Sequence, residues 1–178
     1  IGTVAMIHRV VRAPDNTLQV VVQGLERFRI EYWLESDSYL RAHIAIAPDV
    51  VEPDVELDAL ERSLRELAKE VIALSPNLPE DAEKFLEQVQ DPRYLAYLVA
   101  ANARWEPGDG QKLLEMDNVK DKFRALIAHL TREKEVLTLG QKIQTEAREE
   151  MDKAQREYYL RQQLKAIQKE LGESEDGT

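Results

Sequence analysis

Few residues in this sequence have the types and spacing that catalysis or metal binding requires. The 178 residues include no cysteine, and the three histidines, His8, His43 and His129, lie far apart in the chain. Zinc sites and metalloprotease motifs use histidines or cysteines a few positions apart, because neighbouring ligands on one element converge on the ion. The sequence therefore predicts no metal site, and we expect the histidines to be ordinary polar residues of strands and surfaces.

Phosphate-binding and acid-base motifs are equally weak. The segments Gly110-Gln111-Lys112 and Gly140-Gln141-Lys142 lack the earlier glycine and the following Ser or Thr of a loop that cradles phosphates. Carboxylate pairs such as Glu80-Asp81 and Glu149-Glu150 fall in charged stretches, where solvation or helix-terminal charge accounts for them. We therefore predict no catalytic residue and no cofactor-binding residue in this chain.

Composition narrows the class of partner. The chain carries 24 Lys and Arg against 34 Asp and Glu, a net charge of −10, which repels phosphate backbones and anionic lipids. No apolar stretch approaches the roughly 20 residues that span a bilayer. The chain starts at Ile1 with neither an initiator methionine nor a basic signal segment, so we expect a fragment of a cytoplasmic protein whose partners are proteins.

The first 50 residues have the pattern of a small antiparallel sheet. Apolar and polar residues alternate with a period of two, and turn-forming residues, including Gly24, interrupt the pattern. We expect this β-rich subdomain, residues 1–50, to be incomplete at its N-terminus and to leave an unpaired edge. The predicted strands are Thr3 to Val11, Leu18 to Val22, Leu25 to Tyr32 and Tyr39 to Ile46.

Residues 54–137 change to the three-to-four spacing of helices. Asp54 is expected to cap the first helix, and Asp91 with Pro92 to begin the third. Short helices joined by Pro and Gly connectors predict a compact helical bundle. The predicted helices span residues 55–74, 79–90, 92–102 and 109–115, with Asp117 as the cap of a longer helix.

The last part of the chain predicts one long helix. No proline occurs from Asn118 to Leu171, and only Gly140 disfavours the helix, by about 1 kcal/mol relative to alanine. We expect residues 138–172 to project with coiled-coil character and residues 173–178 to form an acidic linker. The predicted fold class is α+β: a truncated small antiparallel β subdomain, a helical bundle and a long C-terminal helix. The candidate assembly contacts are Leu160, Leu164, Ile167 and Leu171.

Three segments carry a family resemblance. The stretch from Gln155 to Glu173 closely resembles the long-helix signature of ATP-dependent Lon proteases of the LonA type. Gly2 to Ala5 and Gly24 to Ile30 resemble two strands of the same family, and Leu113 to Glu115 resembles the segment before the long helix. The resemblance covers the whole chain in the family's order.

This resemblance implies the N-terminal region of a Lon protease. In this family that region captures unfolded, damaged or degron-bearing proteins and helps to hold a homohexamer. The resemblance places the ATPase module, which binds ATP and Mg, and the Ser-Lys proteolytic module beyond Thr178. The fragment itself is then not an enzyme, although the parent chain is an ATP-dependent serine protease. Neither nucleic acid nor a membrane is an expected partner.

Large apolar residues are the candidate contacts with polypeptide. Three consecutive large residues, Tyr32 to Leu34, cannot all face one side of a strand. Methionine and tyrosine on a charged helix suit adaptable contacts. Packing in a core for Tyr32 to Leu34, and against another helix for the methionine and tyrosines, is the more common role of such residues. The candidate substrate-binding residues are Phe28, Tyr32, Trp33, Leu34, Met151, Tyr158 and Tyr159.

Two other functions fit parts of the pattern. A stand-alone coiled-coil scaffold or adaptor would use the second half of the long helix to dimerise, without any link to an unfoldase. A nucleic-acid module built on the small sheet is disfavoured by the net negative charge and by the scarcity of lysine in the predicted strands.

Overall fold

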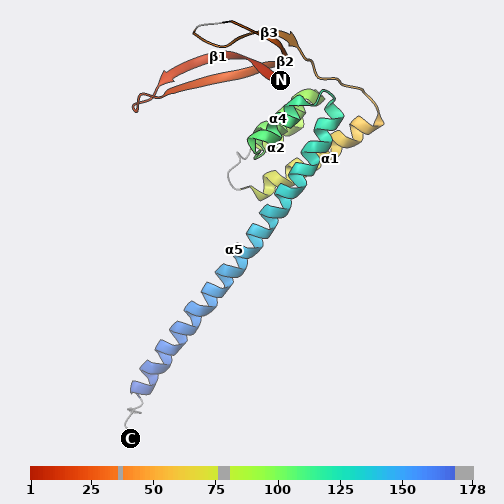
Figure 1. Ribbon diagram of the computed structural model, residues 1–178. Helices are drawn as coiled ribbons and strands as arrows, with labels where there is room; N and C mark the ends of the chain where they lie inside the picture. The colour runs from red at the N-terminus through yellow and green to blue at the C-terminus, as the bar shows by residue number, and fades with distance from the viewer. Residues whose placement is uncertain (36–37, 76–80, 171–178) are drawn as a thin grey trace. The chain divides into compact units, whose positions relative to one another are not determined.

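A computed structural model of the chain describes residues 1–35, 38–75 and 81–170, shown in Figure 1. The chain divides into two units, residues 1–132 and residues 133–178, which we describe separately. Among the described residues, no helix combines the length and apolarity needed to cross a membrane. The order of elements is β1 (Gly2–Arg12), β2 (Leu18–Leu34), β3 (Arg41–Ile46), α1 (Val55–Leu74), α2 (Ala82–Gln88), α3 (Pro92–Asn102), α4 (Pro107–Glu115) and α5 (Val119–Glu170).

The three strands form one antiparallel sheet in the order β1-β2-β3 (Figure 1). The hairpin between β1 and β2 turns at Asp15 and Asn16. The Asp15 carboxylate accepts hydrogen bonds from the backbone and the hydroxyl of Thr17, at 3.0 and 2.6 Å, and Asn16 has a positive φ of 67°. Asparagine tolerates this left-handed conformation better than most residues, so the turn closes as expected from its sequence.

The predicted break at Gly24 is wrong. The second and third predicted strands are one 17-residue strand, β2, and Gly24 pairs with Ala5 beside an irregularity in the register. A Cβ on Gly24 would lie 3.2 Å from the Thr3 Cγ2 atom, so the glycine leaves room for a neighbouring strand. A glycine within a strand often marks such a bulge or close approach rather than a turn.

The helices begin where the sequence predicts, with two differences. The side chain of Asp54 accepts from the Leu57 N–H at 2.9 Å, and Asp91 accepts from the Arg93 N–H at 2.8 Å, so both predicted caps are confirmed. Helix α4 begins at Pro107 rather than at residue 109, because proline fits the first turn of a helix. The first helix ends at Leu74 with Ser75 as its C-cap, as predicted, and Pro76 lies outside the described residues. The second helix, predicted over residues 79–90, is described from Ala82 to Gln88.

Asp117 does not cap α5 as predicted. The Asn118 side chain accepts from the Lys120 N–H at 2.8 Å, whereas the Asp117 carboxylate pairs with Arg27 and Arg29 of strand β2. The neighbouring amide performs the capping because the two arginines hold the carboxylate away from the helix end.

The helical part of the first unit has the apolar core. Its fully buried side chains include Leu64 of α1, Leu95 of α3, and Val119, Phe123 and Leu126 of α5. Helix α5 continues through Gly140 to Glu170, which confirms the predicted long helix over the described residues. From Thr138 to Lys169 every residue of α5 is exposed, and the predicted acidic linker lies outside the described residues.

Candidate functional site

One face of the sheet gathers exposed apolar side chains. In the register of β2 and β3, Phe28 lies opposite Ile46, and Ile30 lies opposite Ile44. Side chains directly opposite each other in an antiparallel pair share one face of the sheet. Ile30 and Ile44 are each more than one-third exposed, and Ile46 is 52% exposed. A continuous apolar strip therefore follows the contact between the two strands.

A bulge adds a tryptophan to this strip. The register shifts between Ile30 and Tyr32, so that Tyr32 lies opposite His43 and Trp33 lies opposite Ala42. Ala42 shares its face of β3 with Ile44 and Ile46, because successive side chains of a strand point to alternate faces. Trp33, 60% exposed, thus extends the apolar strip. We call this surface the sheet patch; it consists of Phe28, Ile30, Trp33, Ile44 and Ile46.

Phe28 anchors the patch by packing on the neighbouring strand. Its ring lies over Gly2 of β1, where an added Cβ would come within 2.5 Å of the Phe28 Cζ atom. Any side chain at position 2 would push the ring away, so the glycine permits this contact. Phe28 is half-buried and combines a packing role with partial exposure at the patch.

Tyr32 and Leu34, two other sequence candidates, lie on the opposite face. Tyr32 stacks on His43 with ring centroids 5.0 Å apart, and His43 Nδ1 lies 2.6 Å from the carboxylate of Glu31. Leu34 lies opposite Arg41, two residues further along β2. The structure therefore brings together Phe28 and Trp33 but not the whole candidate set. Ile30, Ile44 and Ile46 were not among the predicted contacts, although the alternation of apolar and polar residues in β2 and β3 was the signal that could have identified them.

The candidates on α5 do not form one stripe. Met151 and Tyr158 are seven residues apart and share a face, whereas Leu160 is displaced by about 200° from Tyr158 at 100° per residue. Leu164 and Ile167 follow Leu160. All of these side chains are exposed, and Tyr159 accepts a hydrogen bond from Gln163 at 3.0 Å. The apolar stripe therefore changes sides of the helix after Tyr158. Leu171 lies outside the described residues.

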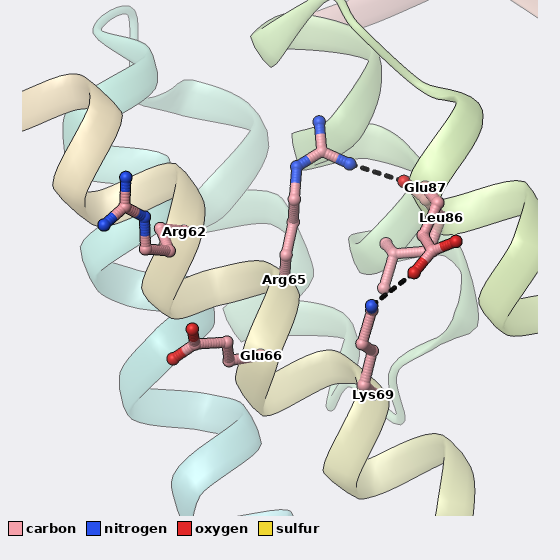
Figure 2. Close-up of a pocket in the computed structure, with 6 residues that line it drawn as sticks. All are labelled: Arg62, Arg65, Glu66, Lys69, Leu86 and Glu87. Atoms are coloured by element: carbon pink, nitrogen blue, oxygen red, sulfur yellow. Dashed lines mark hydrogen bonds and ion pairs between the residues drawn. The ribbon is translucent and has the colours of Figure 1, made fainter.

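The cavity between α1 and α2 has a structural explanation (Figure 2). Its volume is about 280 Å³. Arg65 donates to the backbone oxygens of Leu86 and Val89, and Lys69 pairs with Glu87, whose carboxylate raises the pKa of the Lys69 ammonium. These bonds join the two helices and pair Arg65 and Lys69 at the cavity. Its lining residues are Arg62, Arg65, Glu66, Lys69, Leu86 and Glu87.

The histidines make polar or packing contacts with neighbouring side chains. His8 hydrogen-bonds to Gln23 at 2.8 Å, and His129 stacks on Trp105 at a centroid distance of 3.9 Å. In the described part of the chain, no three His, Cys, Asp or Glu side chains come close enough to hold a metal ion.

Comparisons with known proteins identify the family. Residues 1–132 match the profile of the ATP-dependent protease La (LON) substrate-binding domain. The chain is 42% identical over 173 residues to a Lon protease of Dictyoglomus thermophilum and 44% identical over 179 residues to Lon protease 2 of Sorangium cellulosum. These alignments cover 97% and 99% of this chain but only 22% of each relative. The chain thus spans about a fifth of the length of its relatives.

A solved structure shares the fold. The N-terminal domain of a Mycobacterium avium complex Lon protease superposes with a TM-score of 0.64 at 22% identity, covering 73% of this chain and 69% of that one. The antiparallel sheet followed by helices, including the long one, is thus the fold of a Lon N-terminal domain. The chain belongs to the Lon protease family and contains that family's N-terminal substrate-binding domain.

Proposed function

We propose that the sheet patch captures unfolded or damaged proteins for a Lon protease. The observation that carries this proposal is the exposed row of Ile30, Trp33, Ile44 and Ile46 on one sheet face. Contiguous exposed apolar surface marks an interaction site, and segments of an unfolded chain offer the apolar side chains that fit it. The family match to a substrate-binding domain supports the same conclusion.

The test is the affinity of this chain for a fluorescently labelled, permanently unfolded protein. Trp33→Thr combined with Ile44→Thr keeps residues that suit strands but removes most of the apolar area. The affinity should fall by about tenfold or more, since each buried large apolar side chain contributes about 1.5–3 kcal/mol. Val55→Thr is the matched control, because Val55 is 85% exposed at the start of α1, outside the patch. Equal affinity of the patch variant and the control would overturn the proposal.

For the longer protein we propose delivery of the captured chain to an ATPase that binds ATP and Mg, and then to a serine protease module, in the cytoplasm. Met151, Tyr158 and Tyr159 are the candidate second contacts with polypeptide. In the longer protease, Met151→Ala should lower degradation of an unfolded protein while ATP hydrolysis and cleavage of short peptides persist. Loss of all three activities together with disassembly would identify these side chains as assembly contacts instead.

Self-association is the second proposed role, with a homohexamer as the assembled state. The exposed side chains of Leu160, Leu164 and Ile167 favour it, because a helix with an unpaired apolar stripe is stabilised by a partner. Light scattering of this chain and of one ending at Leu137 should show a larger oligomer only for the chain with complete α5. A strong dimer that binds no unfolded protein would favour the scaffold alternative.

A further inference from the structure

A buried charged cluster connects the sheet to the first turns of α5. The carboxylate of Asp49, just after β3, is its centre. Asp49 Oδ1 lies 3.0 Å from Arg27 Nε of β2 and 3.0 Å from Lys122 Nζ of α5. The Tyr97 hydroxyl of α3 donates to Asp49 Oδ2 at 2.8 Å. We call these four residues the Asp49 cluster. Around Asp49 it joins side chains of β2, α3 and α5, which are distant in sequence.

The three charged side chains of the cluster are buried, and Tyr97 is partly exposed. Arg27 is 5% exposed and Lys122 only 1%. Burial lowers the pKa of the Lys122 ammonium despite its pairing with Asp49, and burial together with the Asp49 hydrogen bond raises the pKa of Tyr97. Both buried cations pair with this one carboxylate. Its loss would leave Lys122 without the carboxylate that it pairs with and Arg27 with Asp117 alone.

Arg27 also reaches the end of α4. Its guanidinium donates to the backbone oxygens of Leu114 and Met116, at 2.7 and 3.0 Å. Carbonyls in the last turn of a helix have no partner within the helix, so a buried arginine satisfies them well. The same guanidinium pairs with Asp117 at 3.2 Å. One side chain of β2 thus fixes the segment that leads into α5.

Backbone bonds reinforce this connection. Val50 N donates to Asp117 O at 2.8 Å, and Val119 N donates to Val50 O at 3.0 Å, which forms a short parallel bridge. Lys120 pairs with Asp54 at the cap of α1. The segment between β3 and α1 is therefore bound to the start of α5 at Val50 and at Asp54 as well as through Asp49.

Apolar packing contributes little to holding the sheet in place. Among the described residues of the first 50, only Arg27 and Ala47 are buried. The sheet has no apolar core of its own, and a three-stranded sheet without such packing is marginally stable. The polar contacts around Arg27 and Asp49 are consequently the principal attachment of the sheet to the helices.

We propose that the Asp49 cluster is a coupling device that makes the sheet and the start of α5 move as one body. Load on a polypeptide held at the sheet patch would then pass through Arg27 and Asp49 into α5 without the sheet detaching. This use of the coupling depends on the proposed capture function, but the coupling itself does not. It is therefore testable in the absence of any bound polypeptide.

The test is native-state hydrogen exchange of this chain with Asp49→Asn. Breaking a buried ion pair should accelerate exchange of β2 and β3 amides by about 100-fold or more, because the released sheet loses its support. Amides of α1 and α3 should keep their wild-type rates. Asp109→Asn, which breaks the exposed pair with Lys112, is the control and should change neither set.

Two outcomes would overturn the coupling proposal. Unchanged exchange in the sheet would show that other contacts hold it, and equal acceleration in sheet and helices would show a general stabilising role. If Asp49→Asn does not fold, Tyr97→Phe decides the matter, since it removes the hydrogen bond to Asp49 and the one that the hydroxyl accepts from Lys122 Nζ, and keeps the ring. It should accelerate sheet amides selectively, by about fivefold to tenfold. Affinity for unfolded protein should persist in either folded variant, because neither substituted residue belongs to the sheet patch. Loss of affinity would show that the variant has altered the sheet patch itself.

Discussion

The sheet and the helices of residues 1–132 use their apolar residues in opposite ways. The helices bury Leu64, Leu95, Phe123 and Leu126 in a common core, whereas the sheet leaves Trp33 and Ile46 more than half exposed. The sheet keeps its strands through backbone pairing and its position through buried charge. Apolar side chains that are exposed on a sheet face are available to a partner, and the proposed capture function depends on this difference between the two regions.

The largest expected difference between the two regions comes from truncating an apolar residue in each. Leu95→Ala should lower the free energy of unfolding by about 3 kcal/mol, because Leu95 is fully buried and the change leaves a cavity. Ile46→Ala, on the exposed face of β3, should cost about 1 kcal/mol or less. Urea unfolding followed by circular dichroism measures both. Similar losses for the two variants would mean that the sheet patch belongs to a core.

A second variant tests the contact that shapes the patch. Gly2→Ala places a Cβ 2.5 Å from the Phe28 ring, and the ring must tilt away. The expected loss is about 1 kcal/mol, at the low end for overpacking, because the contacting atom is the movable end of a half-buried side chain. Chemical shifts of Phe28 and Ile46 should change in NMR spectra. Gly108→Ala is the control, since no atom lies within 4 Å of the added Cβ, and unchanged Phe28 signals in Gly2→Ala would contradict the packing described.

Sequence patterns predicted those features that depend on local chemistry. Asp54 and Asp91 cap helices as predicted because a cap needs only the residue and the next few backbone amides. Trp33 was found as a candidate because no strand can hide three consecutive large residues on one face.

Features that depend on distant residues were missed. The Asp49 cluster joins positions 27, 49, 97 and 122. The strand pattern around Arg27 does not show that this side chain will be buried and paired with Asp49, 22 positions away. The continuity of β2 through Gly24 likewise depends on the close approach of Thr3, which the local pattern around Gly24 does not show. Long-range charge pairing and strand register are settled only by the folded arrangement.

A substitution at Gly140 tests the intrinsic stability of the helix without changing its packing. No atom lies within 4 Å of the position of an added Cβ, and the surrounding helix is exposed. Gly140→Ala should therefore stabilise α5 locally by about 0.5–1 kcal/mol. Increased helicity by circular dichroism and slower exchange of nearby amides would show this. A loss of helicity would indicate that a partner approaches the glycine closely.

The smallest expected effect concerns the ion pair between Asp54 and Lys120 at the junction of α1 and α5. The Lys120 ammonium, followed by the Leu57 N–H, holds the pKa of Asp54 below its ordinary value of 3.8. As pH falls, the unfolded chain therefore takes up the Asp54 proton before the folded chain does. The stabilising contribution is complete above pH 3.8 and is lost as pH falls through the lower pKa of the folded state.

Asp54→Asn tests this directly, because asparagine retains the helix cap but not the charge. At neutral pH the variant should be slightly less stable than the wild type in urea unfolding, and the gap should close as pH falls below 3.8. Asp58→Asn, which removes a carboxylate from the same first turn and leaves the Lys120 pair intact, should show no comparable closing of the gap. Equal stability of the variant and the wild type at every pH would mean that Asp54 contributes as a hydrogen-bond acceptor alone, because asparagine keeps the acceptor and lacks only the charge.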